Sequence, residues 1–209
     1  MKLYHFPPSP NSRRVLATAY HLGFAPELIT VQLPAGENMA PEFTALNPNN
    51  KIPVFVDDDG FVVWESTAIM RYLISKDPDN NLYADDPRTQ AQIDQWLAWN
   101  IAHWSPACQV YVFENLVKGI LDLGEPDPGE LKKAEELFHR FAGILNAHLK
   151  GKQWLVNEQL SIADFAVASF LDLRDGAKMP YQDYHEIIRW FNSIEALEAW
   201  KKSAPANFT

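Results

Sequence analysis

The sequence changes its hydrophobic period once, close to residue 80, and this change constrains the fold more than any other feature. Before it, short β-branched runs alternate with segments whose apolar residues recur at helical spacing. After it, every long segment has helical spacing and no convincing pair of strands remains. These later segments are 89–121, 129–149, 161–174 and 184–201. The pattern predicts an α+β domain followed by an all-helical domain.

The first part of the chain predicts the element order βαβαββα. Strands are expected at 2–6, 28–33, 53–56 and 61–64, and helices at 9–22, 41–46 and 66–74. The first two strands should be parallel because a helix joins them, and the last two antiparallel because an acidic turn with Gly60 joins them. We expect domains at 1–77 and 89–209, joined by a linker at 78–88 that is rich in Pro, Asp and Asn.

Composition excludes several functional classes. A net charge of -9 argues against sequence-independent binding of nucleic acid, and no run of about 18 apolar residues predicts a membrane span. The single Cys108 allows no internal disulfide, and we expect it to be buried rather than nucleophilic. The histidines show no metal-ligand spacing, so no metal is expected. With no signal peptide apparent at the N-terminus, we expect a cytoplasmic protein.

The segment LSIADFAVA predicts the start of a helix in the second domain. Ser161 can cap it and Asp164 can return a hydrogen bond to the Ser161 amide, while Leu160 and Phe165 can pack together beside the cap. We interpret this capping box as a folding signal without a chemical role.

Pro53 lies at the start of a predicted strand. Proline cannot donate a backbone hydrogen bond, so strands accept it only at the first residue, at an edge or at a bulge. It is either an ordinary trans proline at a strand start or a cis proline at a sharp turn. A cis bond would turn the Ile52 amide and carbonyl away from the sheet, where they could pair with an extended peptide ligand.

Two helix starts carry further polar groups. Ser66 and the free amides at its helix start could hold a carboxylate, and Glu65 could accept from an ammonium group. Ser9, Asn11 or Ser12 could stabilise a thiolate at the start of the first helix. The alternative for both is that these residues only cap their helices.

Together these motifs resemble those of the cytosolic glutathione S-transferases, over the whole length of the chain. The resemblance rests on the order of elements, Ile52-Pro53, Glu65-Ser66 and LSIADFAVA. It implies a thioredoxin-like domain followed by a helical bundle, a cis Pro53, and a homodimer. It also implies an enzyme that activates the thiol of glutathione for attack on a hydrophobic electrophile.

The resemblance further implies how glutathione would bind. The tripeptide would lie extended beside Ile52 and Pro53, with its γ-glutamyl end at Glu65 and Ser66. Lys51 matches a position that commonly contacts the glycine end or the backbone. Asn38 and Met39 fall where some plant-type members place His and Lys for the glycine carboxylate. Met39 cannot bind a carboxylate, so that contact is weakened or relocated.

The activating residue and the class remain open at this point. The Ser9 to Arg13 segment resembles the serine-type classes, theta or phi. The segments PNNKIP and SPN also resemble bacterial nu-like members that reduce disulfides, in which a Thr and an Asn take the activating places. We rank Ser9 first, Asn11 second and Ser12 third. Tyr4 lies within a strand, which argues against a tyrosine-type enzyme, and the absence of a cysteine at the activator position argues against the cysteine-bearing classes.

A pocket for the electrophile is expected between the domains. Its candidate walls are Phe6, Pro10, Trp104, Tyr111 and Phe113, although Trp104 and Tyr111 could equally be core residues of a helix rich in aromatic side chains. Two other functions stay open on the same fold. One is glutathione-dependent reduction of disulfides or peroxides, and the other is a non-enzymatic binding or regulatory role.

Overall fold

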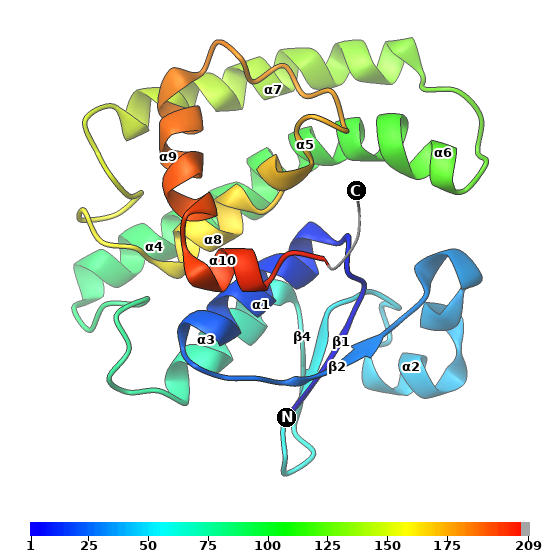
Figure 1. Ribbon diagram of the computed structural model, residues 1–209, viewed down its shortest axis with the longest axis vertical. Helices are drawn as coiled ribbons and strands as arrows, with labels where there is room; N and C mark the ends of the chain where they lie inside the picture. The colour runs from blue at the N-terminus through cyan, green and yellow to red at the C-terminus, as the bar shows by residue number, and fades with distance from the viewer. Residues whose placement is uncertain (206–209) are drawn as a thin grey trace. The chain divides into compact units, whose positions relative to one another are not determined.

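The computed structural model describes residues 1–205 and divides into two compact units (Figure 1). The first comprises Met1–Asn80 together with the segment from Leu197 onward, and the second is Asn81–Ala196. Within the described residues no helix is both long enough and apolar enough to cross a membrane.

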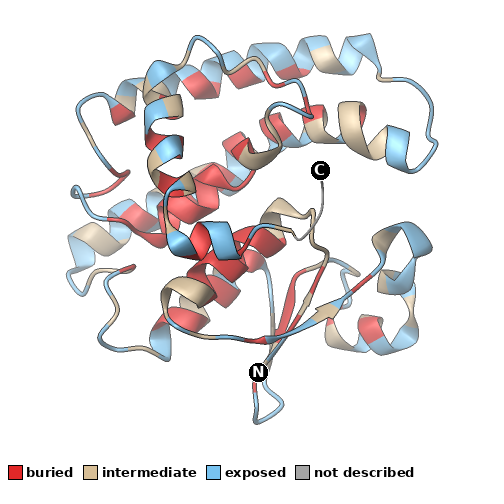
Figure 2. Cartoon of the chain, in the orientation of Figure 1, coloured by how far each residue is buried: buried red, intermediate tan, exposed pale blue. Residues whose placement is uncertain are grey.

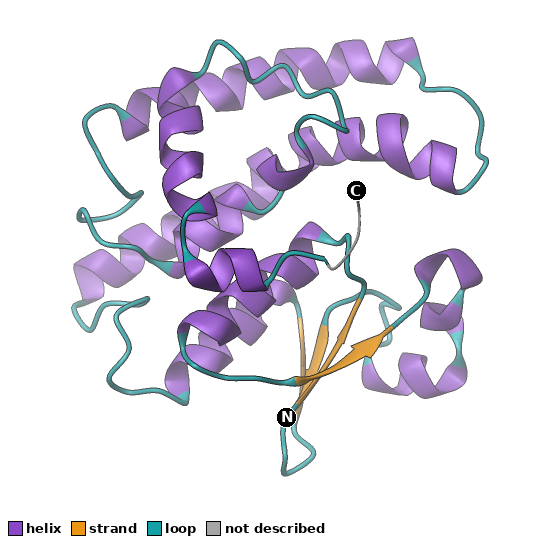
Figure 3. Cartoon of the chain, viewed as in Figure 1, coloured by secondary structure: helices purple, strands orange, loops and turns teal. Residues whose placement is uncertain are grey.

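The first unit contains a four-stranded mixed sheet (Figure 3). The strands are β1 (Lys2–His5), β2 (Glu27–Thr30), β3 (Val54–Val56) and β4 (Val62–Trp64), in the order β2-β1-β3-β4. β1 is parallel to β2, and β3 is antiparallel to both β1 and β4. The predicted element order and strand directions are therefore confirmed.

Helices cover both faces of this sheet. On one face α1 (Pro10–His21) and α3 (Ser66–Ser75) pack together, and the buried Phe55 of the sheet contacts Tyr72 of α3 with 5.9 Å between ring centroids. On the other face α2 (Pro41–Leu46) brings Phe43 against Tyr4, with 6.2 Å between ring centroids. Successive side chains of each strand point to opposite faces of the sheet, so each strand contributes side chains to both apolar layers.

The second unit is entirely helical apart from turns and one isolated bridge. The predicted helix 89–121 is one long helical path, α4 (Pro87–Trp99), α5 (Ser105–Val112) and α6 (Lys118–Ile120), with π-helical segments at Asn100–Trp104 and Phe113–Val117. α7 (Pro128–Leu149), α8 (Ile162–Ala168) and α9 (His185–Glu195) complete it. Cys108 is fully buried, as expected.

The last predicted helix differs from expectation. Residues 184–201 form two helices, α9 and α10 (Glu198–Lys202), separated at Leu197, which caps α10 with an extended backbone. α10 belongs to the first unit, where it packs against α1. Helical spacing continues through this break, so the sequence pattern alone does not reveal it.

The predicted capping box is confirmed, and it forms the centre of a buried polar network in the second unit. The fully buried Asp164 carboxylate accepts hydrogen bonds from the Leu155 amide, the Ser161 amide and hydroxyl, and the Trp190 indole N–H, at 2.9 to 3.0 Å. Burial raises the pKa of Asp164 to about 6, against these four hydrogen bonds, which favour the charged form. All four partners are donors, so the arrangement suits the ionised carboxylate, which can accept from each of them.

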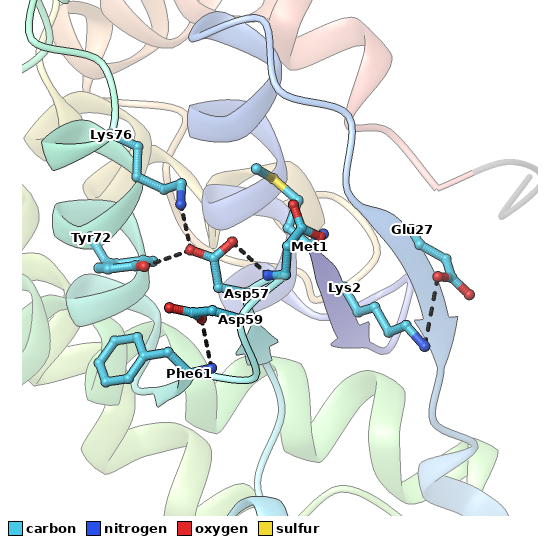
Figure 4. A network of polar contacts seen from close by, with 9 residues as sticks. Met1, Lys2, Glu27, Asp57, Asp59, Phe61, Tyr72 and Lys76 are labelled. Atoms are coloured by element: carbon cyan, nitrogen blue, oxygen red, sulfur yellow. Dashed lines mark hydrogen bonds and ion pairs between the residues drawn. The ribbon is translucent and has the colours of Figure 1, made fainter.

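A second polar network closes the β3–β4 turn in the first unit (Figure 4). The buried Asp57 carboxylate accepts from the Tyr72 hydroxyl at 2.6 Å and from the Lys76 ammonium group, both on or just after α3. The N-terminal ammonium group pairs with the neighbouring Asp58. The hydrogen bond from Lys76, followed by that from Tyr72, lowers the pKa of Asp57 from 3.8 to about 2.

This network predicts a loss of stability in acid. The folded-state pKa of Asp57 lies below its unfolded value, so the carboxylate contributes stability that is present above about pH 4 and is lost as the pH falls toward 2. Asp57→Asn should flatten the dependence of unfolding free energy on pH in this window, measured by urea unfolding. Asp79→Asn, on an exposed turn, is the matched control, and an unchanged slope in Asp57→Asn would contradict the role of the network.

Candidate functional site

The strand register brings three separate segments to one edge of the sheet. Tyr4 on β1 pairs with Val54 on β3, and Val54 pairs with Trp64 on β4, so these three residues form one row across the sheet. β1 and β4 end at this edge and β3 begins there. The segments that follow β1, precede β3 and follow β4 therefore lie next to one another, and they contain Ser9, Ile52 and Glu65.

Ser9 lies at the start of α1 and is partly exposed. Its backbone is extended, with φ -73° and ψ 122°, and its amide donates to the Phe6 carbonyl at 2.9 Å. Its hydroxyl caps α1 by accepting from the Ser12 amide at 3.4 Å, the outer limit of a hydrogen bond. Such a weak cap leaves the hydroxyl proton able to donate to a ligand atom at this positive helix end.

The other two candidates at this helix start differ in access. Asn11 is partly exposed, and its side chain makes no hydrogen bond within the described part of the chain. Ser12 is fully buried, and its hydroxyl accepts from the Phe6 amide at 3.4 Å. Burial therefore favours Ser9 and Asn11 over Ser12 for contact with a ligand.

The Ile52-Pro53 peptide bond is cis, which confirms the expectation drawn from the resemblance. β3 begins one residue later, at Val54, so Ile52 stands outside the ladder. Among residues 1–205 its amide and carbonyl have no hydrogen-bond partner, while its side chain packs against the core cluster of Val31, Phe43 and Val54. The backbone of Ile52 is thus anchored by its side chain and free to pair with an extended ligand.

An asparagine network that the sequence reasoning missed supports this segment. The buried Asn47 side chain donates to the Lys51 carbonyl at 2.7 Å and accepts from the Asn49 amide at 3.0 Å. The Asn50 carbonyl accepts from the Asn38 side chain at 2.9 Å, and its own side chain accepts from Thr44 at 2.7 Å. The run of asparagines before Lys51 was the available signal, because Asn side chains readily bond to nearby backbone in turns.

This network changes the interpretation of the glycine-end candidates. The Asn38 amide group donates to Asn50 and so helps to hold the loop. Met39 is 64% exposed and offers no group for a carboxylate. Lys51 is exposed and forms no ion pair within the described residues, so its ammonium group is available at this end of the site.

Glu65 and Ser66 open α3 with an unusual backbone. Glu65 adopts φ 72° and ψ 115°, in the region that favours glycine. Backbone of this kind is costly and is often found at ligand sites. Ser66 is the first residue of α3 and is 8% exposed, and the Glu65 side chain makes no ion pair within residues 1–205. Thr67, which sequence reasoning missed, lies beside them, and its buried hydroxyl has no hydrogen-bond partner among residues 1–205.

The aromatic residues expected to line a second pocket are in different environments. Phe6 and Pro10 flank Ser9 and are partly exposed, and Phe113 is 41% exposed. Trp104 is fully buried, donates from its indole to the Val167 carbonyl at 3.0 Å and contacts Phe138. Tyr111 also contacts Phe138, and burial raises its pKa to about 12. For Trp104 and Tyr111 the structure favours the alternative that they are core residues of the second unit.

Comparison with protein families gives two matches. Residues 1–75 match the glutathione S-transferase N-terminal domain, and residues 104–198 match the glutathione S-transferase C-terminal domain. Together the two matched segments cover most of the chain.

Known proteins resemble the chain along nearly its whole length. Glutathione S-transferase 3 of Zea mays is 32% identical, with 99% of this chain and 94% of that protein covered. Glutathione S-transferase D7 of Drosophila melanogaster is 30% identical, with 97% and 88% covered. The crystal structure of glutathione transferase F2 from Populus trichocarpa superposes with a TM-score of 0.88 at 26% identity, with 97% and 96% covered.

Proposed function

The chain belongs to the glutathione S-transferase family of enzymes, and we propose that it ionises the thiol of glutathione and directs the thiolate at a hydrophobic electrophile. The observation that carries this proposal is the common row of Tyr4, Val54 and Trp64. It places the helix start at Ser9, the unpaired main chain at Ile52 and the helix start at Ser66 along one edge. These groups suit a tripeptide with a central thiol and charged ends.

Each part of the site would bind a different part of the tripeptide. The Ser66 hydroxyl and the first amides of α3 would hold the γ-glutamyl carboxylate, and Glu65 would accept from its ammonium group. The main chain of Ile52 would pair with the cysteinyl backbone. Lys51 would contact the glycine end. With both ends and the central backbone bound in this way, the thiol would lie toward the start of α1.

Catalysis would follow from charge stabilisation at that helix start. The Ser9 hydroxyl would donate to the sulfur, and the dipole of α1 would favour the negative charge, so both lower the pKa of the thiol. A decrease of one unit corresponds to about 1.4 kcal/mol. The thiolate then forms a bond to an electrophilic carbon, whose leaving group takes the bonding pair, while the thiol proton goes to solvent. Phe6 and Pro10 beside Ser9 would contact the apolar part of the electrophile.

Glutathione-dependent reduction of a disulfide is the second candidate. The Asn11 side chain at the same helix start is partly exposed and makes no hydrogen bond within residues 1–205. There the thiolate attacks a sulfur atom, and the departing sulfur takes the bonding pair. Turnover of a chloronitroaromatic compound against a small disulfide, each with glutathione, separates the two reactions. Binding of glutathione with neither turnover would instead support the non-enzymatic alternative. The homodimer and the cytoplasmic location stay predictions.

Ser66→Ala should weaken the binding of glutathione about tenfold, because it removes one hydrogen bond to a carboxylate. Isothermal titration calorimetry with glutathione measures this directly. Ser75→Ala is the matched control, since Ser75 is the last residue of the same helix and its exposed hydroxyl donates to the Tyr72 carbonyl within that helix. Equal affinities in Ser66→Ala and the wild type would contradict the placement of the γ-glutamyl carboxylate.

A further inference from the structure

We propose that Trp200, on the C-terminal helix α10, is a positioning residue for the first turn of α1, and through it for the Ser9 hydroxyl. The inference rests on the proposed function, in which the Ser9 hydroxyl donates to the thiolate. Trp200 would keep that hydroxyl in position. The connection runs through one side chain, Arg13, and we call the contact the Arg13–Trp200 pair.

The Arg13–Trp200 pair is buried and has two components. The Arg13 guanidinium lies over the Trp200 ring, with its central carbon 4.4 Å from the ring centroid. One of its terminal nitrogens donates to the Trp200 carbonyl at 3.4 Å. Arg13 is 7% exposed and Trp200 is 1% exposed. A cation over a tryptophan face is stabilised most when both are shielded from water.

The hydrogen bond also completes the end of a very short helix. α10 has five residues, and the Trp200 carbonyl near its C-terminus accepts from the Ser203 hydroxyl at 2.7 Å as well as from Arg13. A positively charged donor is favourable at this end because of the helix dipole. Arg13 and Ser203 therefore both contribute to the C-terminal end of α10.

Arg13 is directly connected to Ser9. Its amide donates to the Ser9 carbonyl at 3.0 Å, the first hydrogen bond of α1, and the preceding amide of Ser12 donates to the Ser9 hydroxyl. Movement of Arg13 would therefore move both the carbonyl and the hydroxyl of Ser9. Figure 2 shows α1 coloured mostly as buried, with the buried part of α10 beside it.

A second contact between the same helices supplies an internal control. The Lys202 ammonium group lies 4.4 Å from the Tyr20 ring centroid, near the far end of α1. This contact also joins α10 to α1, but it acts about three helical turns away from Ser9. Loss of the Arg13–Trp200 pair should affect the thiol, whereas loss of the Lys202–Tyr20 contact should not.

The test compares Trp200→Leu, Trp200→Phe and Lys202→Ala in the full chain. Leu retains an apolar side chain but removes the aromatic face, whereas Phe retains a face for Arg13. We expect Trp200→Leu to raise the pKa of the thiol of bound glutathione by about one unit. It should also lower kcat/KM for conjugation of a chloronitroaromatic compound about tenfold, since small displacements of a reacting group have effects of this order. Trp200→Phe should keep the thiol pKa and kcat/KM close to the wild-type values, and Lys202→Ala should match the wild type in both.

The pKa of the bound thiol is read from the ultraviolet absorbance of the thiolate as a function of pH, which a general loss of stability would not shift. If folded Trp200→Leu keeps the wild-type thiol pKa and kcat/KM, the inference is overturned. If Trp200→Leu does not fold, Arg13→Met, which leaves the Trp200 ring in place, is measured with the same two outcomes. If the wild type itself shows no thiolate with glutathione, the proposed function fails instead.

Discussion

Replacing Ser9 by alanine is expected to lower kcat/KM for conjugation of a chloronitroaromatic compound about 100-fold. The loss of one preorganised donor to a charge in the reacting system costs a factor of this size. The pKa of the thiol of bound glutathione should rise in parallel, because a hydroxyl that donates to sulfur favours the thiolate over the thiol. The affinity for glutathione should change little, since the contacts proposed for the tripeptide at Ile52, Glu65 and Ser66 stay intact.

The fold should survive this substitution. Within residues 1–205 the Ser9 hydroxyl accepts one hydrogen bond, the long 3.4 Å bond from the Ser12 amide, so the loss of the cap should cost about 1 kcal/mol or less. Asn11→Ala is the comparison, because Asn11 is the other accessible polar group at the same helix start. Full activity in Ser9→Ala together with inactivity in Asn11→Ala would transfer the activating role to Asn11.

The sequence predicts the elements of this fold well because the determining patterns are local. Alternation between strands and helices, the Asp-Gly turn at Gly60 and the capping box at Ser161 each depend on residues within a few positions of one another. Connectivity predicts the directions of the β1–β2 and β3–β4 pairs, but the pairing of β1 with β3 joins distant segments and is given by the structure. With that pairing, strand direction brings the segments of Ser9, Ile52 and Glu65 to one edge.

Other features depend on contacts between distant residues and leave no local signal. The separation of α9 from α10 goes with a contact of Trp200 with Arg13, 187 positions apart in sequence. The burial of Trp104 depends on where Phe138 and Val167 lie. Helical spacing identifies an apolar face for such a residue, but it does not tell whether that face meets a core or a ligand.

Replacing Asp164 by alanine is expected to have the largest effect on stability of the substitutions considered. The carboxylate accepts four hydrogen bonds in a site with no exposure to solvent. Alanine would leave the Leu155, Ser161 and Trp190 donors buried without partners, each at a cost of about 1–3 kcal/mol before relaxation. We expect a loss of about 3–5 kcal/mol in unfolding free energy, or roughly 10 °C in melting temperature.

Urea unfolding of three further variants isolates the network from the cap. Asp86→Ala removes an exposed N-cap that accepts from Arg88 and Thr89, and it should cost only about 1 kcal/mol. Trp190→Phe removes one donor to Asp164, and its cost should be smaller in the Asp164→Ala background, where that donor is already without a partner. If the costs of Asp164→Ala and Trp190→Phe simply add, or if Asp164→Ala costs no more than Asp86→Ala, the carboxylate acts as an ordinary helix cap and the buried network contributes nothing of its own.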